Sequence, residues 1–196
     1  MTGYDPNDKD IVIRGLPGDY TVVLVDGRRQ NTRETMNRGT GGVQYAFMPP
    51  LAAIERIEVA RGPMSSLYGS EAIGGVINII TRKVPDEWSA SWDSSVTLQS
   101  DDDYGNSRET QFWIGGPIKD DVLGLQVYGS YDDMSEGSTY YPSADGVYGR
   151  NARSLGLKLA LRPTSNQDLV LDVSSQRLTM ESTPGESIPP DLDWYK

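Results

Sequence analysis

The chain contains neither cysteine nor histidine. Without cysteine it has no disulfides and no Cys-based zinc site, and without histidine it lacks the commonest general acid or base and the commonest metal ligand. Hydrolytic triads and histidine-dependent metal catalysis are therefore unsupported. We expect a protein that is not an enzyme, with no catalytic residue, no metal site and no cofactor of its own.

Long hydrophobic runs are also missing. A membrane helix needs ~20 consecutive apolar residues, whereas the longest apolar run, at residues 76–80, is interrupted by Asn78. Any passage through a membrane must therefore use β-strands. The first ten residues, MTGYDPNDKD, lack the basic and apolar regions of a secretory signal.

Charge is distributed unevenly along the chain. The formal net charge is −10, and nearly all of it belongs to residues 88–196, whereas residues 1–87 are close to neutral. An acidic chain without a basic stripe disfavours nucleic-acid binding. The change in composition near residues 84–88 predicts two units, at residues 1–84 and 85–196.

The first unit has the pattern of a small α+β globule. A Pro-Pro pair predicts the start of a short helix over residues 51–56. The β-branched residues that follow, at 57–60, turn the chain into a strand. A second helical turn is expected at residues 65–68, ended by Gly69 in a left-handed conformation. Residues 76–80 form a further β-branched strand.

The second unit alternates strictly between apolar and polar side chains, most clearly at residues 88–99. This alternation is typical of strands in a transmembrane barrel, and a tilted strand needs ~9–11 residues to cross. Four more strands are expected, at residues 108–114, 122–131, 154–162 and 169–177.

The connections between these strands alternate in length. Residues 115–121 and 163–168 are short, whereas residues 132–151 and those from 178 onward are long and polar. Short periplasmic turns and long extracellular loops produce this pattern in membrane barrels. Soluble β-sheets also alternate apolar and polar residues, so a soluble β-rich carbohydrate-binding or adhesion module remains an alternative.

Two segments resemble a known family. Residues 54–83, IERIEVARGPMSSLYGSEAIGGVINIITRK, resemble the C-terminal half of the plug domain of TonB-dependent outer-membrane receptors. Residues 11–30, with their IRG and VLVDG elements, are similar to an earlier part of the same domain. The sequence of residues 61–83 is most similar to the enterobactin and colicin I receptor branch of the family. The resemblance implies a mainly β fold: the C-terminal part of a plug, followed by the first strands of a 22-stranded-type transmembrane β-barrel, incomplete here.

The resemblance also implies a function. Receptors of this type import ferric catecholate siderophores across the outer membrane of Gram-negative bacteria, and the iron arrives chelated in the ligand. The implied partners are the siderophore, TonB through a TonB box missing from this chain, outer-membrane lipid and lipopolysaccharide, and colicin or phage. Receptors of the same fold for cobalamin, haem or oligosaccharide stay open as alternatives.

The ligand-binding candidates come from a basic, glycine-containing segment at residues 28–47. Guanidinium groups are permanently charged and present forked donors, which suits anionic ligands, and aromatic side chains add stacking surface. Arg28, directly after the Asp-Gly turn, is expected at the barrel wall instead. The candidates are Arg29, Arg33, Arg38, Tyr45 and Phe47.

A second set of candidates concerns the attachment of the plug. Arg14 and Arg61 match the family's IRG and RGP arginines, and the resemblance implies that they pair with barrel carboxylates, because an unpaired buried charge is costly. The alternative is that both arginines only cap turns on the plug surface. Glu55 and Glu58 are expected to form local salt bridges or plug–barrel contacts rather than to act as catalytic acids.

Overall fold

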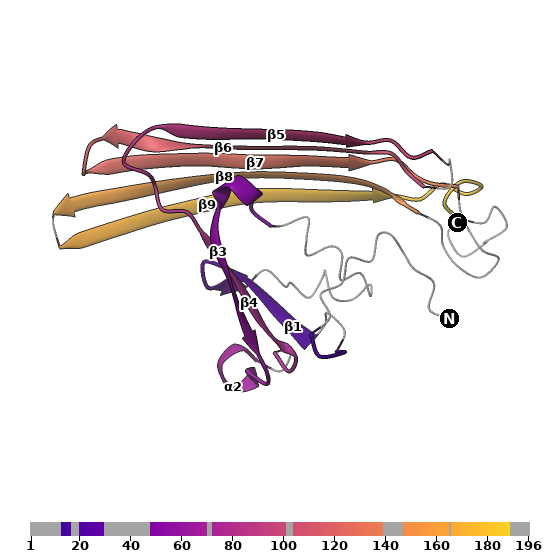
Figure 1. Ribbon diagram of the computed structural model, residues 1–196, viewed down its shortest axis with the longest axis horizontal. Helices are drawn as coiled ribbons and strands as arrows, with labels where there is room; N and C mark the ends of the chain where they lie inside the picture. The colour runs from indigo at the N-terminus through magenta and orange to yellow at the C-terminus, as the bar shows by residue number, and fades with distance from the viewer. Residues whose placement is uncertain are drawn as a thin grey trace.

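Two β-sheets make up the computed structural model, which describes residues 13–16, 20–29, 48–69, 72–100, 104–138, 147–164 and 166–188. A long five-stranded sheet runs across the molecule, and a smaller four-stranded sheet stands against one of its faces (Figure 1). We call them the barrel sheet and the plug sheet. In the described part of the chain, no helix is long and apolar enough to cross a membrane.

The plug sheet has the strand order β2-β1-β4-β3. Its central strand β4 pairs in parallel with β1 and antiparallel with β3. β4 is buried along most of its length, as expected for a strand covered on both sides. The strands are β1 (Thr21–Val25), β2 (Arg28–Arg29), β3 (Ile54–Arg61) and β4 (Gly75–Thr81).

The two helical elements of the plug are short. The helix predicted over residues 51–56 is wrong in length: η3 (Leu51–Ala53) is one 3-10 turn, because Ile54 already pairs with Thr81 across β3 and β4. The second predicted turn is confirmed as α2 (Ser65–Tyr68). It ends at Gly69, whose φ of 90° is positive but whose ψ of 174° is extended rather than left-handed helical.

The barrel sheet follows chain order, and every neighbouring pair is antiparallel. The predicted fold class and the five antiparallel strands are therefore confirmed. The strands are β5 (Ser89–Thr97), β6 (Ser107–Lys119), β7 (Leu123–Met134), β8 (Gly149–Thr164) and β9 (Gln167–Glu181).

Most of these strands are longer than the sequence pattern predicted. β8 begins at Gly149 instead of 154, and β9 continues to Glu181 instead of 177. Backbone hydrogen bonds between strands do not require apolar side chains. Strand pairing therefore extends beyond the residues in which apolar and polar side chains alternate. The connections at one end of the sheet are accordingly shorter than predicted: residues 120–122 join β6 to β7, and β9 begins at Gln167, three residues after the end of β8 at Thr164. The other end carries the longer connections, which marks it as extracellular.

The two faces of the barrel sheet differ in what covers them. Successive side chains of a strand point to opposite faces, and Gln126, Tyr128 and Lys158 are buried on the face toward the plug. The opposite face exposes apolar side chains, as the alternation predicted. Its exposed aliphatic residues on β8 and β9 are Leu155, Leu157, Leu169, Leu171 and Val173.

Apolar packing joins the plug to the wall. Ala53 of η3 is fully buried against Trp113 of β6 and Tyr128 of β7. Tyr128 pairs with Gly156 across β7 and β8, and its ring lies over that glycine. A Cβ at Gly156 would overlap the ring of Tyr128, so only glycine fits beneath this contact.

We predict that Gly156→Ala displaces Tyr128 from Ala53 and lowers the free energy of unfolding by about 1–3 kcal/mol, because overpacking forces side chains out of their preferred positions. Denaturant unfolding of the receptor that contains this chain measures the change. Ser174→Ala is the control, since Ser174 flanks Gly156 on β9 and is exposed. Equal stability of the two variants would contradict this role of the glycine.

Candidate functional site

The site where plug and barrel meet begins at the turn between β1 and β2. Asp26 and Gly27 occupy this two-residue turn with φ values of 48° and 76°. Positive φ at both positions is what a type I′ hairpin turn requires, and Asp-Gly is among its preferred sequences. The turn directs the carboxylate of Asp26 to the far end of β4 and to the barrel sheet.

Asp26 accepts hydrogen bonds from both parts of the molecule. Its carboxylate receives the backbone N–H of Thr81 at 2.8 Å and the Thr81 hydroxyl at 2.5 Å. The ammonium Nζ of Lys158, on β8, donates to the same carboxylate at 3.0 Å and also contacts the Thr81 hydroxyl. One turn of the plug, the end of β4 and one barrel strand therefore converge on a single carboxylate.

This ion pair explains how a lysine is accommodated inside the molecule. Lys158 is only 8% exposed, and a buried ammonium without a partner carries a large desolvation cost. Burial raises the pKa of Asp26, but hydrogen bonds from Thr81 and Lys158 outweigh burial and leave this pKa below its ordinary value of 3.8. Asp26 is therefore ionised at neutral pH and compensates the charge of Lys158.

A second ion pair lies beside the first, with its signs reversed. Arg28 of the plug approaches Asp172 of β9, with 4.0 Å between guanidinium and carboxylate and 3.5 Å to the Asp172 carbonyl oxygen. Asp172 is the cross-strand partner of Lys158. Arg28 thus lies at the barrel wall as expected, although 64% of its side chain is exposed. Plug and wall each contribute one acid and one base.

Two glutamines of the wall bind plug backbone directly. Gln126, fully buried on β7, donates from Nε2 to the carbonyl oxygens of Arg82 and Lys83 at 3.1 and 2.9 Å. Gln111 accepts the N–H of Leu51 at 3.1 Å, a helix-start donor that has no partner within η3. These bonds hold the chain where it enters η3 and where it leaves β4.

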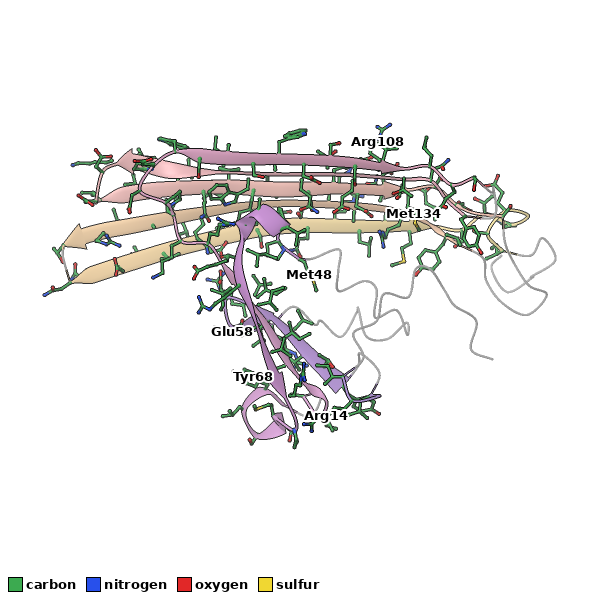
Figure 2. The ribbon with its side chains drawn as sticks, in the orientation of Figure 1. Arg14, Met48, Glu58, Tyr68, Arg108 and Met134 are labelled. Carbon is green, nitrogen blue, oxygen red and sulfur yellow. The ribbon has the colours of Figure 1, made fainter. Side chains whose placement is uncertain are left out.

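The four predicted attachment residues all lie on the plug. Arg14, with a φ of 56°, and Arg61 are exposed, and neither forms an ion pair within the described residues. Figure 2 places Arg14 at the end of the plug sheet remote from β5–β9. Glu55 and Glu58 bind locally to Arg56, at 2.7 and 2.9 Å. Pairing of Arg14 and Arg61 with barrel carboxylates stays a prediction.

Of the predicted ligand-binding residues, the structure describes one. Arg29 is exposed at the end of β2, and its guanidinium lies near Gly69. The other candidates fall outside the described residues: Arg33, Arg38, Tyr45 and Phe47.

Sequence reasoning missed the residues that join the two sheets. Lys158, Gln126 and Asp172 are polar residues at positions that face the plug, and each lies between apolar residues that face away from it. Inward-facing side chains of a membrane barrel are ordinarily polar. The lysine within LGLKLALR therefore predicts an inward position but neither its burial nor its partner.

Comparison with known proteins agrees with this architecture. Residues 1–76 match the family model "TonB-dependent Receptor Plug Domain", and a sheet with the alternation of a membrane barrel follows directly. The chain belongs to the TonB-dependent receptor family.

Its relatives cover both sheets. The iron-regulated outer membrane virulence protein of Vibrio cholerae is 42% identical over 179 residues, which is 91% of this chain and 27% of the relative. The ferrienterobactin receptor of Escherichia coli is 36% identical over 136 residues, 67% of this chain and 18% of the relative. The chain thus spans about a quarter or less of these proteins.

Solved structures of the family have the same fold. The siderophore receptor PirA from Acinetobacter baumannii superposes with a TM-score of 0.76 at 34% identity, covering 87% of this chain and 25% of that one. A mutant of the ferric enterobactin receptor PfeA from Pseudomonas aeruginosa, in complex with enterobactin, gives a TM-score of 0.71 at 26% identity, covering 87% and 27%.

We predict that Lys158→Ala loosens the plug. A hydrogen bond between charged groups contributes about 1.5–3 kcal/mol, so amide hydrogen exchange in β1 and β4 should become about tenfold faster or more. The control is Arg162→Ala, which removes an exposed pair with Asp168 and should change little. Equal exchange in both variants would show that the Lys158 contact does not hold the plug.

The pH dependence of this contact follows from the lowered pKa of Asp26. An aspartate with a lowered folded-state pKa stabilises fully above its unfolded pKa, and its contribution is lost as pH falls through the folded value. The stability difference between the receptor and its Asp26→Asn variant should be constant from about pH 7 to 5 and shrink below the ordinary value of 3.8. Denaturant titrations across this range test it; a difference that persists unchanged in acid would exclude the assigned ionisation.

Proposed function

We propose that the receptor to which this chain belongs imports a ferric catecholate siderophore across the outer membrane of a Gram-negative bacterium. The observation that carries the proposal is the continuity of a plug sheet with barrel strands that bind it through Asp26, Arg28 and Gln126. Relatives named as ferric enterobactin receptors align over both sheets.

The proposed ligand site is the basic segment that begins at the end of β2, with Arg29, Arg33, Arg38, Tyr45 and Phe47. A ferric catecholate complex is anionic and aromatic. Guanidinium groups bind such a ligand through charge-assisted hydrogen bonds, and aromatic side chains stack on its rings. The iron enters already chelated, so the protein itself needs no metal ligands and no cofactor.

Transport in this proposal is a conformational process without covalent chemistry, and the protein is not an enzyme. TonB engages the receptor through a TonB box and drives a rearrangement of the plug. The plug can move only if its contacts with the wall yield. The described contacts are polar ones at Asp26, Arg28, Leu51 and residues 82–83, together with the packing of Ala53 against the wall. Lipid surrounds the outward face of the barrel sheet, and colicin or phage would use the extracellular loops.

The test of the ligand site is the double substitution Arg33→Ala with Arg38→Ala in the full-length receptor, titrated with ferric enterobactin. Losing two charge-assisted hydrogen bonds should weaken binding by about 3–6 kcal/mol if they act independently, enough to move a nanomolar affinity toward the micromolar range. Added salt should also slow the encounter, because exposed charges are screened over ~8 Å at physiological ionic strength.

The matched control is Arg56→Ala, a plug arginine whose charge is already paired with Glu55 and Glu58. Its affinity for ferric enterobactin should equal that of the unchanged receptor. If the double variant also kept its affinity within about twofold, ligand recognition would belong to barrel loops rather than to this segment.

A further inference from the structure

Three connections between strands lie at the end of the barrel sheet opposite the short turns (Figure 1). They follow β5, β7 and β9, and we call them the first, second and third connections. The carboxylate of Glu136, in the second connection, reaches the third. Its Oε2 accepts the backbone N–H of Thr183 at 2.8 Å and the Ser187 hydroxyl at 2.7 Å, and its Oε1 accepts the Thr183 hydroxyl at 2.8 Å. These hydrogen bonds join residues that are 47 and 51 positions apart in the chain.

The third connection is folded into a closed turn over residues 183–188. The carbonyl oxygen of Thr183 accepts the N–H groups of Glu186 and Ile188 at 3.0 and 3.3 Å. The Ser187 hydroxyl accepts the Thr183 N–H at 3.1 Å while it donates to the carboxylate of the second connection. The turn therefore presents two hydroxyl groups and one N–H to a single carboxylate.

The residue before this carboxylate binds the first connection. The N–H of Ser135 donates to the carbonyl oxygen of Asn106 at 2.9 Å, and the Ser135 hydroxyl accepts the Asn106 N–H at 2.9 Å. A Cβ at Gly105 would lie 1.8 Å from the carbonyl oxygen of Ser135, so only glycine fits this approach. Ser135 and Glu136 thus bind a neighbouring connection on either side.

The second and third connections also bury side chains. Ser187 is inaccessible to solvent, and Ile188 and Val147 are 2% and 5% exposed. Val147 belongs to the second connection, where its carbonyl oxygen accepts the N–H of Gly137 at 2.9 Å. Connecting segments usually run over the surface of a protein and are mobile. Buried aliphatic side chains in both connections therefore indicate packed structure rather than independent loops.

Glu136 is ionised when it makes these contacts. Burial raises its pKa, but hydrogen bonds from Ser187 and Thr183 outweigh burial and leave this pKa below its ordinary value of 4.5. An ionised carboxylate accepts hydrogen bonds on both oxygens, whereas a glutamine of the same shape has one acceptor oxygen and a donor amide. Only the carboxylate matches the three donors of the turn.

We propose that Glu136 is a latch that makes the second and third connections move as one body, to which Ser135 joins the first. The alternative is that Glu136 only caps the turn at residues 183–188 and has no effect beyond it. With the latch, a rearrangement of these connections must displace them together or break the bonds to Glu136. The latch rests on the described contacts and does not depend on which ligand the plug recognises.

The experiment measures amide hydrogen exchange by mass spectrometry on the purified full-length receptor in detergent. Glu136→Gln keeps the shape of the side chain but replaces one acceptor oxygen by a donor. We expect exchange at residues 183–188 and at residues 135–138 to become about tenfold faster, because both connections lose their common anchor. Glu186→Gln is the matched control: it removes the same charge from an exposed side chain of the same turn and should leave exchange unchanged.

A second variant, Ser187→Ala, removes one donor and keeps the charge of Glu136. Its effect should be smaller than that of Glu136→Gln, and the double variant should exchange no faster than Glu136→Gln alone. Unchanged exchange at residues 183–188 in Glu136→Gln would overturn the latch. Faster exchange confined to residues 183–188 would reduce Glu136 to a cap of that turn. Strictly additive effects of the two substitutions would show that Ser187 and Glu136 do not act together.

Discussion

The fold depends on one requirement: the ammonium of Lys158 must meet a carboxylate. A lysine as buried as Lys158 is costly unless it is paired, and the carboxylate that it reaches belongs to Asp26 of the plug. Asp26 in turn is presented by a turn that needs positive φ at two positions and is fixed by Thr81 at the end of β4. Register of the wall, turn geometry and plug position therefore determine one another.

The barrel sheet serves two environments at once. Its inward side chains bind the plug through polar contacts and through the packing of Ala53 between Trp113 and Tyr128. Its outward side chains form an exposed, largely apolar surface. Because the pleat alternates residue by residue, each strand carries both chemistries, and a register slip of one residue would exchange them.

Local patterns in the sequence were sufficient to predict where the strands lie. They were not sufficient to predict which side chains of the barrel sheet contact the plug. Alternation and turn residues predicted five antiparallel strands, because both signals act within a few residues. The helix predicted over residues 51–56 was too long, since pairing of Ile54 with Thr81 overrides local preference. Lys158 and Asp26 are 132 residues apart, and no local pattern relates them. The pairing of Arg14 and Arg61 with barrel carboxylates rested on the family resemblance and stays a prediction.

The reciprocal arrangement of the two ion pairs affects what happens when the plug moves. Lys158 and Asp172 are cross-strand neighbours on the wall, and Asp26 and Arg28 are close together on the plug. If the two bodies separate, each keeps one positive and one negative group of its own within reach. After separation Lys158 can pair with Asp172, and Arg28 can pair with Asp26. No charge is then left without an opposite charge nearby, so the electrostatic cost of separation stays small. A contact that is specific when closed is thus also one that can be opened repeatedly.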